Sequence, residues 1–61
     1  MNEGYEKIYF VCDLEGYPKV QEAMKGLDAY ETETTFDQNV YFYAVVAKAD
    51  LEEFNRRLSN P

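Results

Sequence analysis

The chain has no histidine and no tryptophan, and it has a single cysteine among its 61 residues. One cysteine, Cys12, cannot form an internal disulfide, and without histidine the ligand sets of structural zinc sites cannot be assembled. Histidine is also the most frequent general base of enzymes, and no serine or cysteine lies in a recognisable nucleophile motif. We therefore expect Cys12 to pack as a small apolar group, in a protein that is not an enzyme and uses no cofactor or metal.

Long apolar runs are also missing. No stretch approaches the roughly 18 consecutive apolar residues of a membrane-spanning helix, and the first six residues lack the basic and apolar parts of a signal peptide. The three glycines, Gly4, Gly16 and Gly26, are isolated and form no phosphate-binding loop. These absences predict a cytoplasmic protein with a single domain, residues 1–61, which at this length buries only about 60% of its unfolded surface.

Positive charge is scarce, with six Lys and Arg residues against twelve Asp and Glu residues and a net charge of −6. This balance disfavours binding to a nucleic-acid backbone or to an anionic membrane, because both require positive charge on the protein. It favours a protein partner that is itself basic.

Apolar and aromatic residues are plentiful, at 46% and 16% of the chain, which argues against disorder. They are concentrated in Val40–Ala47, whose β-branched and aromatic residues favour a strand. Its even and odd positions are both apolar, whereas a strand with one solvated face would alternate with polar residues. We therefore expect this segment to be the central strand of a small sheet.

Weaker patterns on both sides complete the secondary structure. Tyr5–Leu14 is predicted to be a first strand, and Pro18–Leu27 has the spacing of an amphipathic helix with proline at its first position. Ala29–Phe36 is a threonine-rich second strand, and a last helix begins at Asp50.

Both helices carry signals at their N-terminal ends. Glu15 is expected to meet the positive end of the first helix. Asp50 and Glu53 have the spacing of a capping box at the start of the second. Two ion pairs at a spacing of four residues are also predicted there: Glu52–Arg56 and Glu53–Arg57.

A three-residue loop, residues 37–39, joins the second and third strands, and Asn39 suits a left-handed conformation in it. A loop of this length predicts three cross-strand pairs: Phe36–Val40, Thr34–Phe42 and Tyr30–Val46. Even-numbered residues of both strands then share one face of the sheet, and Glu31 and Glu33 lie on the other.

The element order is strand, helix, strand, strand, helix. A right-handed crossover makes the first two strands parallel, and the third fits antiparallel between them, with both helices on the even-numbered face. This predicts an α+β fold with a three-stranded antiparallel or mixed sheet, a ferredoxin-like βαββα arrangement that lacks its fourth strand. The strand Tyr5–Leu14 keeps an open edge, which we expect to pair with another chain, most simply in a symmetric homodimer.

The odd-numbered face is expected to stay uncovered and to form the binding site. Its members are apolar or aromatic side chains with carboxylates at the rim: Tyr5, Tyr9, Val11, Tyr41, Tyr43, Val45, Glu31 and Glu33. Lys7 and Asp13 complete the rim. Three interpretations remain open: tyrosines that only pack across strands, a protein interface, and a stacking platform for unpaired bases.

Two segments, Ile8–Leu14 (Ile-Tyr-Phe-Val-Cys-Asp-Leu) and Val40–Val45 (Val-Tyr-Phe-Tyr-Ala-Val), resemble the first- and third-strand motifs of the RNA recognition motif. The resemblance implies RNA stacking by three tyrosines: Tyr9, Tyr41 and Tyr43. The chain departs from that family where Asn39 and Val40 replace the basic residue and glycine that open its third-strand motif, and in the missing fourth strand.

The acidic balance also admits mimicry of nucleic acid by a set of carboxylates: Glu31, Glu33, Asp37, Glu52 and Glu53. Ordinary solubilising charge is the alternative. In size and charge the chain resembles regulators, inhibitors and host-takeover proteins that bacteriophages encode. The preferred hypothesis is a regulatory protein that binds a protein partner through its tyrosine-bearing sheet.

Overall fold

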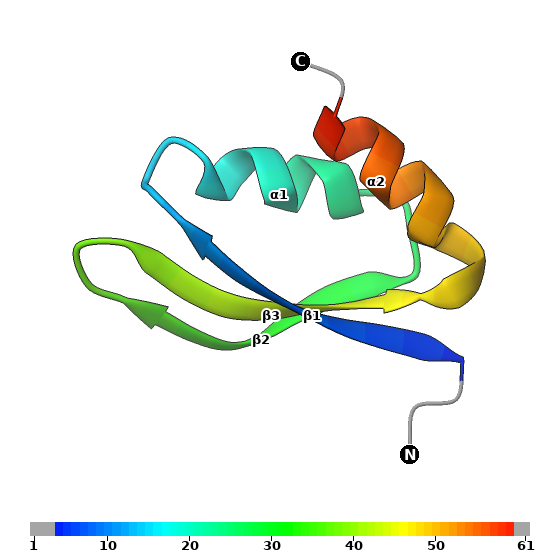
Figure 1. The fold of residues 1–61 in the computed structure, drawn as a ribbon, viewed down its shortest axis with the longest axis horizontal. Helices are drawn as coiled ribbons and strands as arrows, with labels where there is room; N and C mark the ends of the chain where they lie inside the picture. Colours follow the sequence, from blue (N-terminus) through cyan, green and yellow to red (C-terminus); the bar gives the residue numbers. More distant parts are fainter. Residues whose placement is uncertain (1–3, 60–61) are drawn as a thin grey trace.

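The computed structural model describes residues 4–59, which form two helices on one side of a sheet (Figure 1). The elements follow in the order β1 (Tyr5–Cys12), α1 (Tyr17–Met24), β2 (Ala29–Phe36), β3 (Val40–Ala47), a 3-10 turn η1 (Lys48–Asp50) and α2 (Leu51–Ser59). The predicted spans of the second and third strands are confirmed, and the first strand ends two residues earlier than predicted.

The sheet has the strand order β1-β3-β2, and β3 runs antiparallel to both neighbours. The two outer strands are therefore parallel to each other, as predicted for a crossover through α1. Residues 4–59 thus form an α+β fold of order βαββα, the predicted ferredoxin-like arrangement with no fourth strand beside β1 in this part of the chain.

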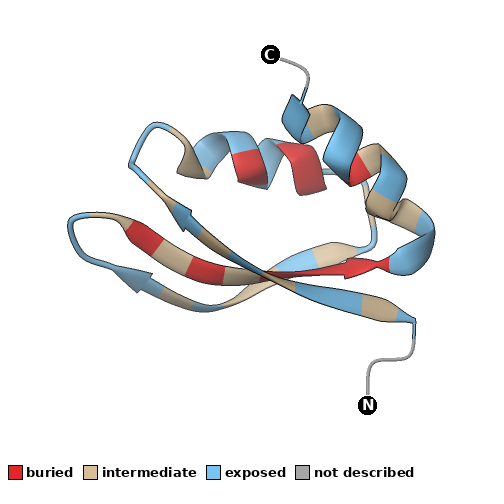
Figure 2. Cartoon of the chain, in the orientation of Figure 1, coloured by how far each residue is buried: buried red, intermediate tan, exposed pale blue. Residues whose placement is uncertain are grey.

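The core lies between β3 and the helices, and Figure 2 shows buried residues on β3, α1 and α2. The even-numbered residues of β3 belong to this buried cluster. Val40, Phe42, Ala44 and Val46 are 0% exposed, and so is Phe54 of α2. Val20, Ala23 and Met24 of α1 complete this cluster. Cys12 packs against it as the small apolar group predicted from sequence, and burial raises the pKa of its thiol.

The start and end of α1 differ from the prediction. The helix begins after Gly16, whose N–H donates to Asp13 Oδ1 at 2.6 Å, so the carboxylate at this end comes from Asp13 and not from Glu15. The helix ends at Met24, three residues early, because Gly26 takes a left-handed conformation (φ 79°) that turns the chain toward β2.

The predicted capping box does not form. Asp50 Oδ2 instead accepts the backbone N–H of Asp28, at 2.9 Å, and so joins the start of α2 to the loop before β2. Glu53 pairs with both Arg56 (2.6 Å) and Arg57 (2.8 Å). The pair Glu53–Arg57 is thus confirmed, whereas Arg56 pairs with Glu53 and not with Glu52.

Candidate binding face of the sheet

The sheet has one face that no helix covers, here called the open face. On β1 and β3 it consists of the odd-numbered residues, because the even-numbered ones point into the core. The structure therefore brings together six of the predicted site residues: Tyr5, Tyr9, Val11, Tyr41, Tyr43 and Val45. These six residues share a face because β1 and β3 pair in a regular register through their full length. That they bind a partner stays a prediction.

A β-bulge in β2 changes the membership of this face. Phe36 pairs with Val40 as predicted, but the register shifts between Thr32 and Thr35, so that Tyr30 pairs with Val45 and not with Val46. The predicted pair Thr34–Phe42 is absent for the same reason. A shift of one residue moves side chains to the opposite face of a sheet.

Because of the bulge, the open face carries Tyr30 in place of Glu31. Tyr30 and Thr32, predicted to face the helices, lie on the open face beside Val45 and Tyr43. The open face therefore carries five of the six tyrosines of the chain: Tyr5, Tyr9, Tyr30, Tyr41 and Tyr43. Sequence periodicity missed Tyr30 because a bulge adds one residue without changing the composition of the strand.

Glu31 lies on the helix side of β2, which corrects its predicted place at the rim of the open face. Its carboxylate accepts hydrogen bonds from Tyr17 Oη (2.6 Å), Thr34 Oγ1 (2.7 Å) and Gln21 Nε2 (3.2 Å). Desolvation favours the protonated form, but these three donors outweigh it and lower the pKa of Glu31. The same contact raises the pKa of Tyr17 to about 12.

Glu33 remains on the open side, in the bulge, with a positive φ of 57°. It is the one non-glycine residue with positive φ among residues 4–59, so Asn39 does not take the left-handed conformation predicted for it. Glu33 Oε2 accepts a hydrogen bond from Lys7 Nζ at 2.9 Å, and Lys7 Nζ also lies 4.5 Å from the ring centroid of Tyr43. Because Lys7 is on β1, its side chain crosses the open face to reach β2.

The crossing Lys7 divides the open face into a covered and an exposed part. Val45 pairs directly with Lys7 in the β1–β3 register and is only 3% exposed, although no helix covers it. Tyr9, Val11 and Tyr30 are 55%, 53% and 55% exposed. Solvent-accessible rings thus lie on both outer strands, and the centre of the face is packed.

Two contacts of the tyrosines support in part the interpretation that these side chains only stabilise the sheet by packing across strands. The rings of Tyr9 and Tyr43 are 5.1 Å apart and tilted by 50°, a favourable aromatic geometry across strands. Tyr5 Oη donates to Asp28 Oδ2 at 2.6 Å, and this bond raises the pKa of Tyr5. Tyr9 and Tyr30 nevertheless keep more than half of their surface available to a partner.

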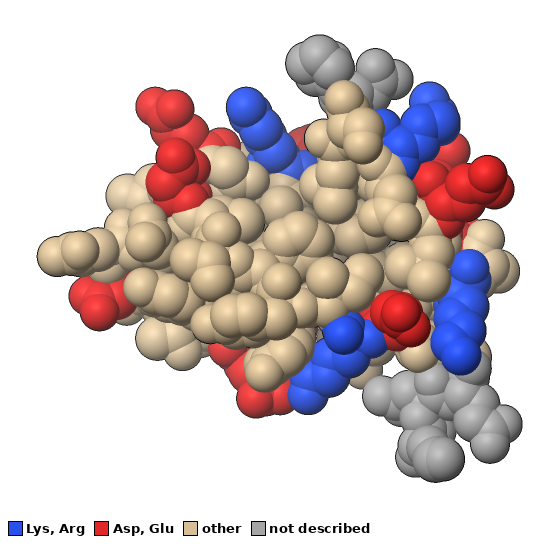
Figure 3. Space-filling model, in the orientation of Figure 1, with Lys and Arg blue, Asp and Glu red and all other residues tan. Residues whose placement is uncertain are grey.

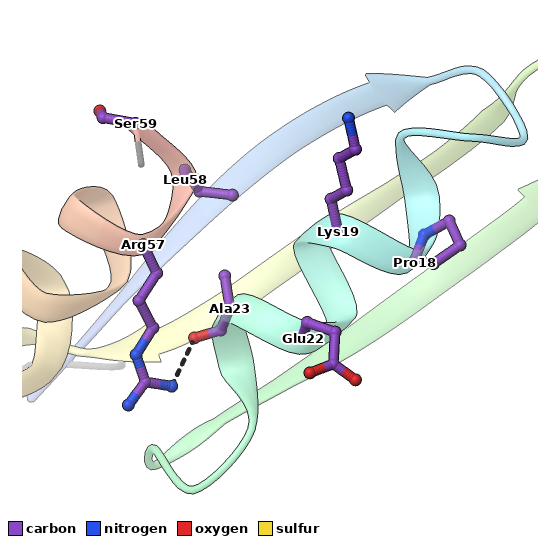
Figure 4. Close-up of a pocket in the computed structure, with 7 residues that line it drawn as sticks. All are labelled: Pro18, Lys19, Glu22, Ala23, Arg57, Leu58 and Ser59. Atoms are coloured by element: carbon purple, nitrogen blue, oxygen red, sulfur yellow. Dashed lines mark hydrogen bonds between the residues drawn. The ribbon is translucent and has the colours of Figure 1, made fainter. Parts of the chain in front are cut away.

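A groove of about 770 Å3 lies between the helices, away from the open face (Figure 4). Its walls mix apolar and charged side chains: Pro18, Lys19, Glu22, Ala23, Arg57, Leu58 and Ser59. Arg57 Nη1 donates to the carbonyls of Ala23 (3.2 Å) and Lys25 (2.7 Å), so this guanidinium ties α2 to the end of α1. Sequence analysis did not anticipate this groove, because it depends on how the two helices are placed.

Within residues 4–59, no group of three or more Cys, Asp or Glu side chains is arranged to hold a metal ion. No helix in the described part of the chain is long and apolar enough to cross a membrane. The chain matches no protein-family model, and comparisons with curated proteins and with solved structures gave no match. The fold and the open face are thus the basis for any functional proposal.

Proposed function

We propose that this is a small acidic, non-enzymatic protein that regulates a protein partner by binding it through the open face. The observation that carries the proposal is the gathering of five tyrosines on the one face of the sheet without helices, with Tyr9 and Tyr30 more than half exposed. Tyrosine is enriched at protein interfaces and at their energetic hot spots, because a large rigid ring is buried at low entropic cost.

The charge of the chain supports a basic partner. Exposed carboxylates of Asp13, Glu15 and Asp37 lie in the loops that follow β1 and precede β3, beside the end of the sheet that carries Val11 and Tyr41. With a net charge of −6, the chain attracts a basic surface over a distance of about a Debye length. Charge then accelerates the encounter, and the apolar rings supply most of the affinity.

The test compares capture of proteins from a bacterial lysate by three immobilised forms of the chain: wild type, Tyr9→Ala and Leu14→Ala. Leu14 is exposed and apolar but lies outside the open face, in the turn after β1, so it is a matched truncation. We expect a stoichiometric protein band with wild type and Leu14→Ala, and its loss with Tyr9→Ala. Equal capture by all three forms contradicts the proposal.

Single-stranded RNA binding is a second candidate, and the bulge favours it. The sequence predicts Glu31 and Glu33 at the rim of the open face, where carboxylates would repel a phosphate backbone. Neither is free there: Glu31 lies under α1, and Glu33 is paired with Lys7. Tyr9, Tyr41 and Tyr43, the stacking residues implied by the resemblance to the RNA recognition motif, share that face. Stacking contributes about 1–3 kcal/mol per base, which must overcome the net negative charge.

Titration with short single-stranded oligonucleotides, followed by tyrosine fluorescence, separates the two candidates. Stacking on Tyr9 quenches the signal in wild type and Leu14→Ala and not in Tyr9→Ala, and the affinity falls as salt is raised. Capture of nuclease-sensitive RNA without a protein band favours this candidate over the first.

Mimicry of nucleic acid gains no support from the contacts. Of the five carboxylates considered for it, Glu31, Glu33 and Glu53 already accept hydrogen bonds from other side chains. The carboxylates that remain, Asp37 and Glu52, are at opposite ends of β3 and form no row along one element.

A further inference from the structure

The outer edge of β1 presents a regular row of backbone groups. Lys48 N–H donates to the carbonyl of Gly4 at 2.8 Å, in the same register that pairs Tyr5 with Ala47. Backbone groups of an antiparallel strand alternate between its two sides. The even-numbered residues of β1 therefore bond to β3, and the N–H and C=O groups of Tyr5, Lys7, Tyr9 and Val11 point away from the sheet.

The outer edge of β2 is different. The bulge between Thr32 and Thr35 interrupts its backbone groups. Beside the bulge β2 also carries two charged residues, Glu31 on the helix side and Glu33 on the side of the open face. Bulges and charges are the features by which natural sheets prevent pairing between edges. β1 has neither a bulge nor a proline, and its last five residues, Ile8–Cys12, carry no charge.

The charge around the β1 edge is distributed unevenly along the strand. Figure 3 views the molecule from the side on which β1 lies nearest, and a broad area in the middle of this view carries no charged side chain. At the left of the view, where β1 ends, the only charged side chains are Asp and Glu. Lys and Arg side chains lie toward the top, the bottom and the right of the view. Asp13 and Glu15 follow β1, and Lys7 lies near its start.

We propose that the β1 edge pairs with the β1 edge of a second copy of this chain, antiparallel and about a two-fold axis at Tyr9. Only pairings that oppose odd with odd residues align the outward backbone groups. An axis at Tyr9 opposes Tyr9 with Tyr9, Ile8 with Phe10, and Lys7 with Val11, over residues 6–12. An axis at Glu6 would place the Glu6 residues of both copies opposite each other, and an axis at Lys7 would do the same with the two Lys7 residues, so both axes oppose like charges.

Charge and continuity both support a second copy as the occupant. Reversal of the strand direction brings the acidic end of one copy, with Asp13 and Glu15, to the start of β1 in the other. There the exposed Lys48 lies next to Gly4, beside Glu6 and a Lys7 that is paired with Glu33 of its own chain. The pairing joins two three-stranded sheets into one of six strands, with the helices of both copies on the same side. The open faces then become continuous across the axis, and two Tyr9 rings lie next to each other at its centre.

Sedimentation of chemically synthesised chains tests the backbone pairing. An N-methyl group on the Tyr9 amide blocks an outward N–H and leaves the side chain and the β1–β3 bonds in place. The matched control is an N-methyl group on the Glu31 amide. Ala47 N–H donates to Asp28 C=O, so Glu31 N–H faces outward on the β2 edge. We expect wild type and the Glu31 control to approach twice 7.2 kDa as concentration rises to millimolar, and the Tyr9 form to stay at 7.2 kDa.

Either of two results overturns the proposal: a wild type that stays monomeric at millimolar concentration, or a dimer that the Glu31 modification dissociates and the Tyr9 modification does not. Circular dichroism must show the same fold in all three chains. Because each copy carries a net charge of −6, added salt should also strengthen the dimer.

A pair of charge variants tests the direction of pairing. Val11→Glu places a carboxylate opposite Lys7 of the second copy, and Val11→Lys places an ammonium there. We expect Val11→Glu to dimerise several-fold more tightly than Val11→Lys at low salt, with the difference reduced at high salt. Net charge alone predicts the reverse order, since Val11→Lys lowers the repulsion between copies. The reverse order therefore overturns antiparallel pairing at this edge.

Discussion

The two outer strands of this sheet have the same length and the same direction, yet they meet β3 and the solvent in different ways. β1 pairs with β3 at every residue from Tyr5 to Cys12, and it keeps strict alternation between core and open face. β2 pairs regularly only on either side of its bulge. Figure 2 shows both strands as partly exposed, beside a β3 that is buried along much of its length.

The difference between β1 and β2 shows that the two outer strands have different roles in the fold. β1 supplies regular backbone and exposed rings, which suit pairing and contact. β2 supplies a bulge that turns Tyr30 toward the open face and Glu31 toward α1, where a carboxylate holds the helix to the sheet. Under the pairing proposed above, β1 is the strand that associates, and the bulge protects β2 from it.

Removing the Glu31 carboxylate has the largest expected effect on this contrast. Glu31→Ala leaves the partly buried hydroxyls of Tyr17 and Thr34 without an acceptor and frees α1 from β2. Hydrogen bonds to a charged group are worth about 1.5–3 kcal/mol, so we expect a loss of about 2 kcal/mol in the free energy of unfolding. Urea denaturation measures it, and Glu15→Ala, an exposed carboxylate in the preceding turn, is the control.

The same interaction has a defined pH dependence. The pKa of Glu31 is lowered in the folded chain, so its stabilisation is present above the unfolded value of about 4.3 and is lost as pH falls through the folded value. The stability difference between wild type and Glu31→Gln should therefore shrink on acidification. A difference that grows on acidification contradicts the assignment.

Glycine should act in opposite ways in the two strands. At Glu33, with φ 57°, a β-branched residue is strained and glycine is not, so Glu33→Val should be less stable than Glu33→Gly by about 1–2 kcal/mol. In β1, Val11→Gly should instead lower stability by about 0.5–1 kcal/mol relative to Val11→Ala. Thermal unfolding of the four variants measures both differences. The same order at both positions would show that the bulge is absent in solution.

The smallest effect is a spectroscopic one. The bond to Glu31 raises the pKa of Tyr17 to about 12, so Tyr17 should ionise late in a titration followed by tyrosinate absorbance. The raised pKa means that this bond stabilises the fold below about pH 10 and is lost as pH rises through 12. Glu31→Gln should move the late step to lower pH. An unchanged titration curve would place Tyr17 away from Glu31.

Much of this molecule follows from its sequence alone. The spans of β2 and β3, the element order, the parallel outer strands and the odd-numbered face of β1 and β3 depend on local residue preference and on a period of two. These properties do not depend on particular tertiary contacts as long as the strands stay regular. The ends of the helices depended on side chains from other segments, as when Asp50 bonded to Asp28 and left the capping box unformed.

Only the tertiary structure decided which side of the sheet Tyr30 and Glu31 occupy. A single extra residue in β2 reverses the faces of everything before it. That residue is accommodated by contacts between distant parts of the chain, Glu31 with Tyr17 and Glu33 with Lys7. The residue types of β2 predict an extended strand. The position of its bulge depends on contacts with distant side chains, which form only when the strands and α1 pack together.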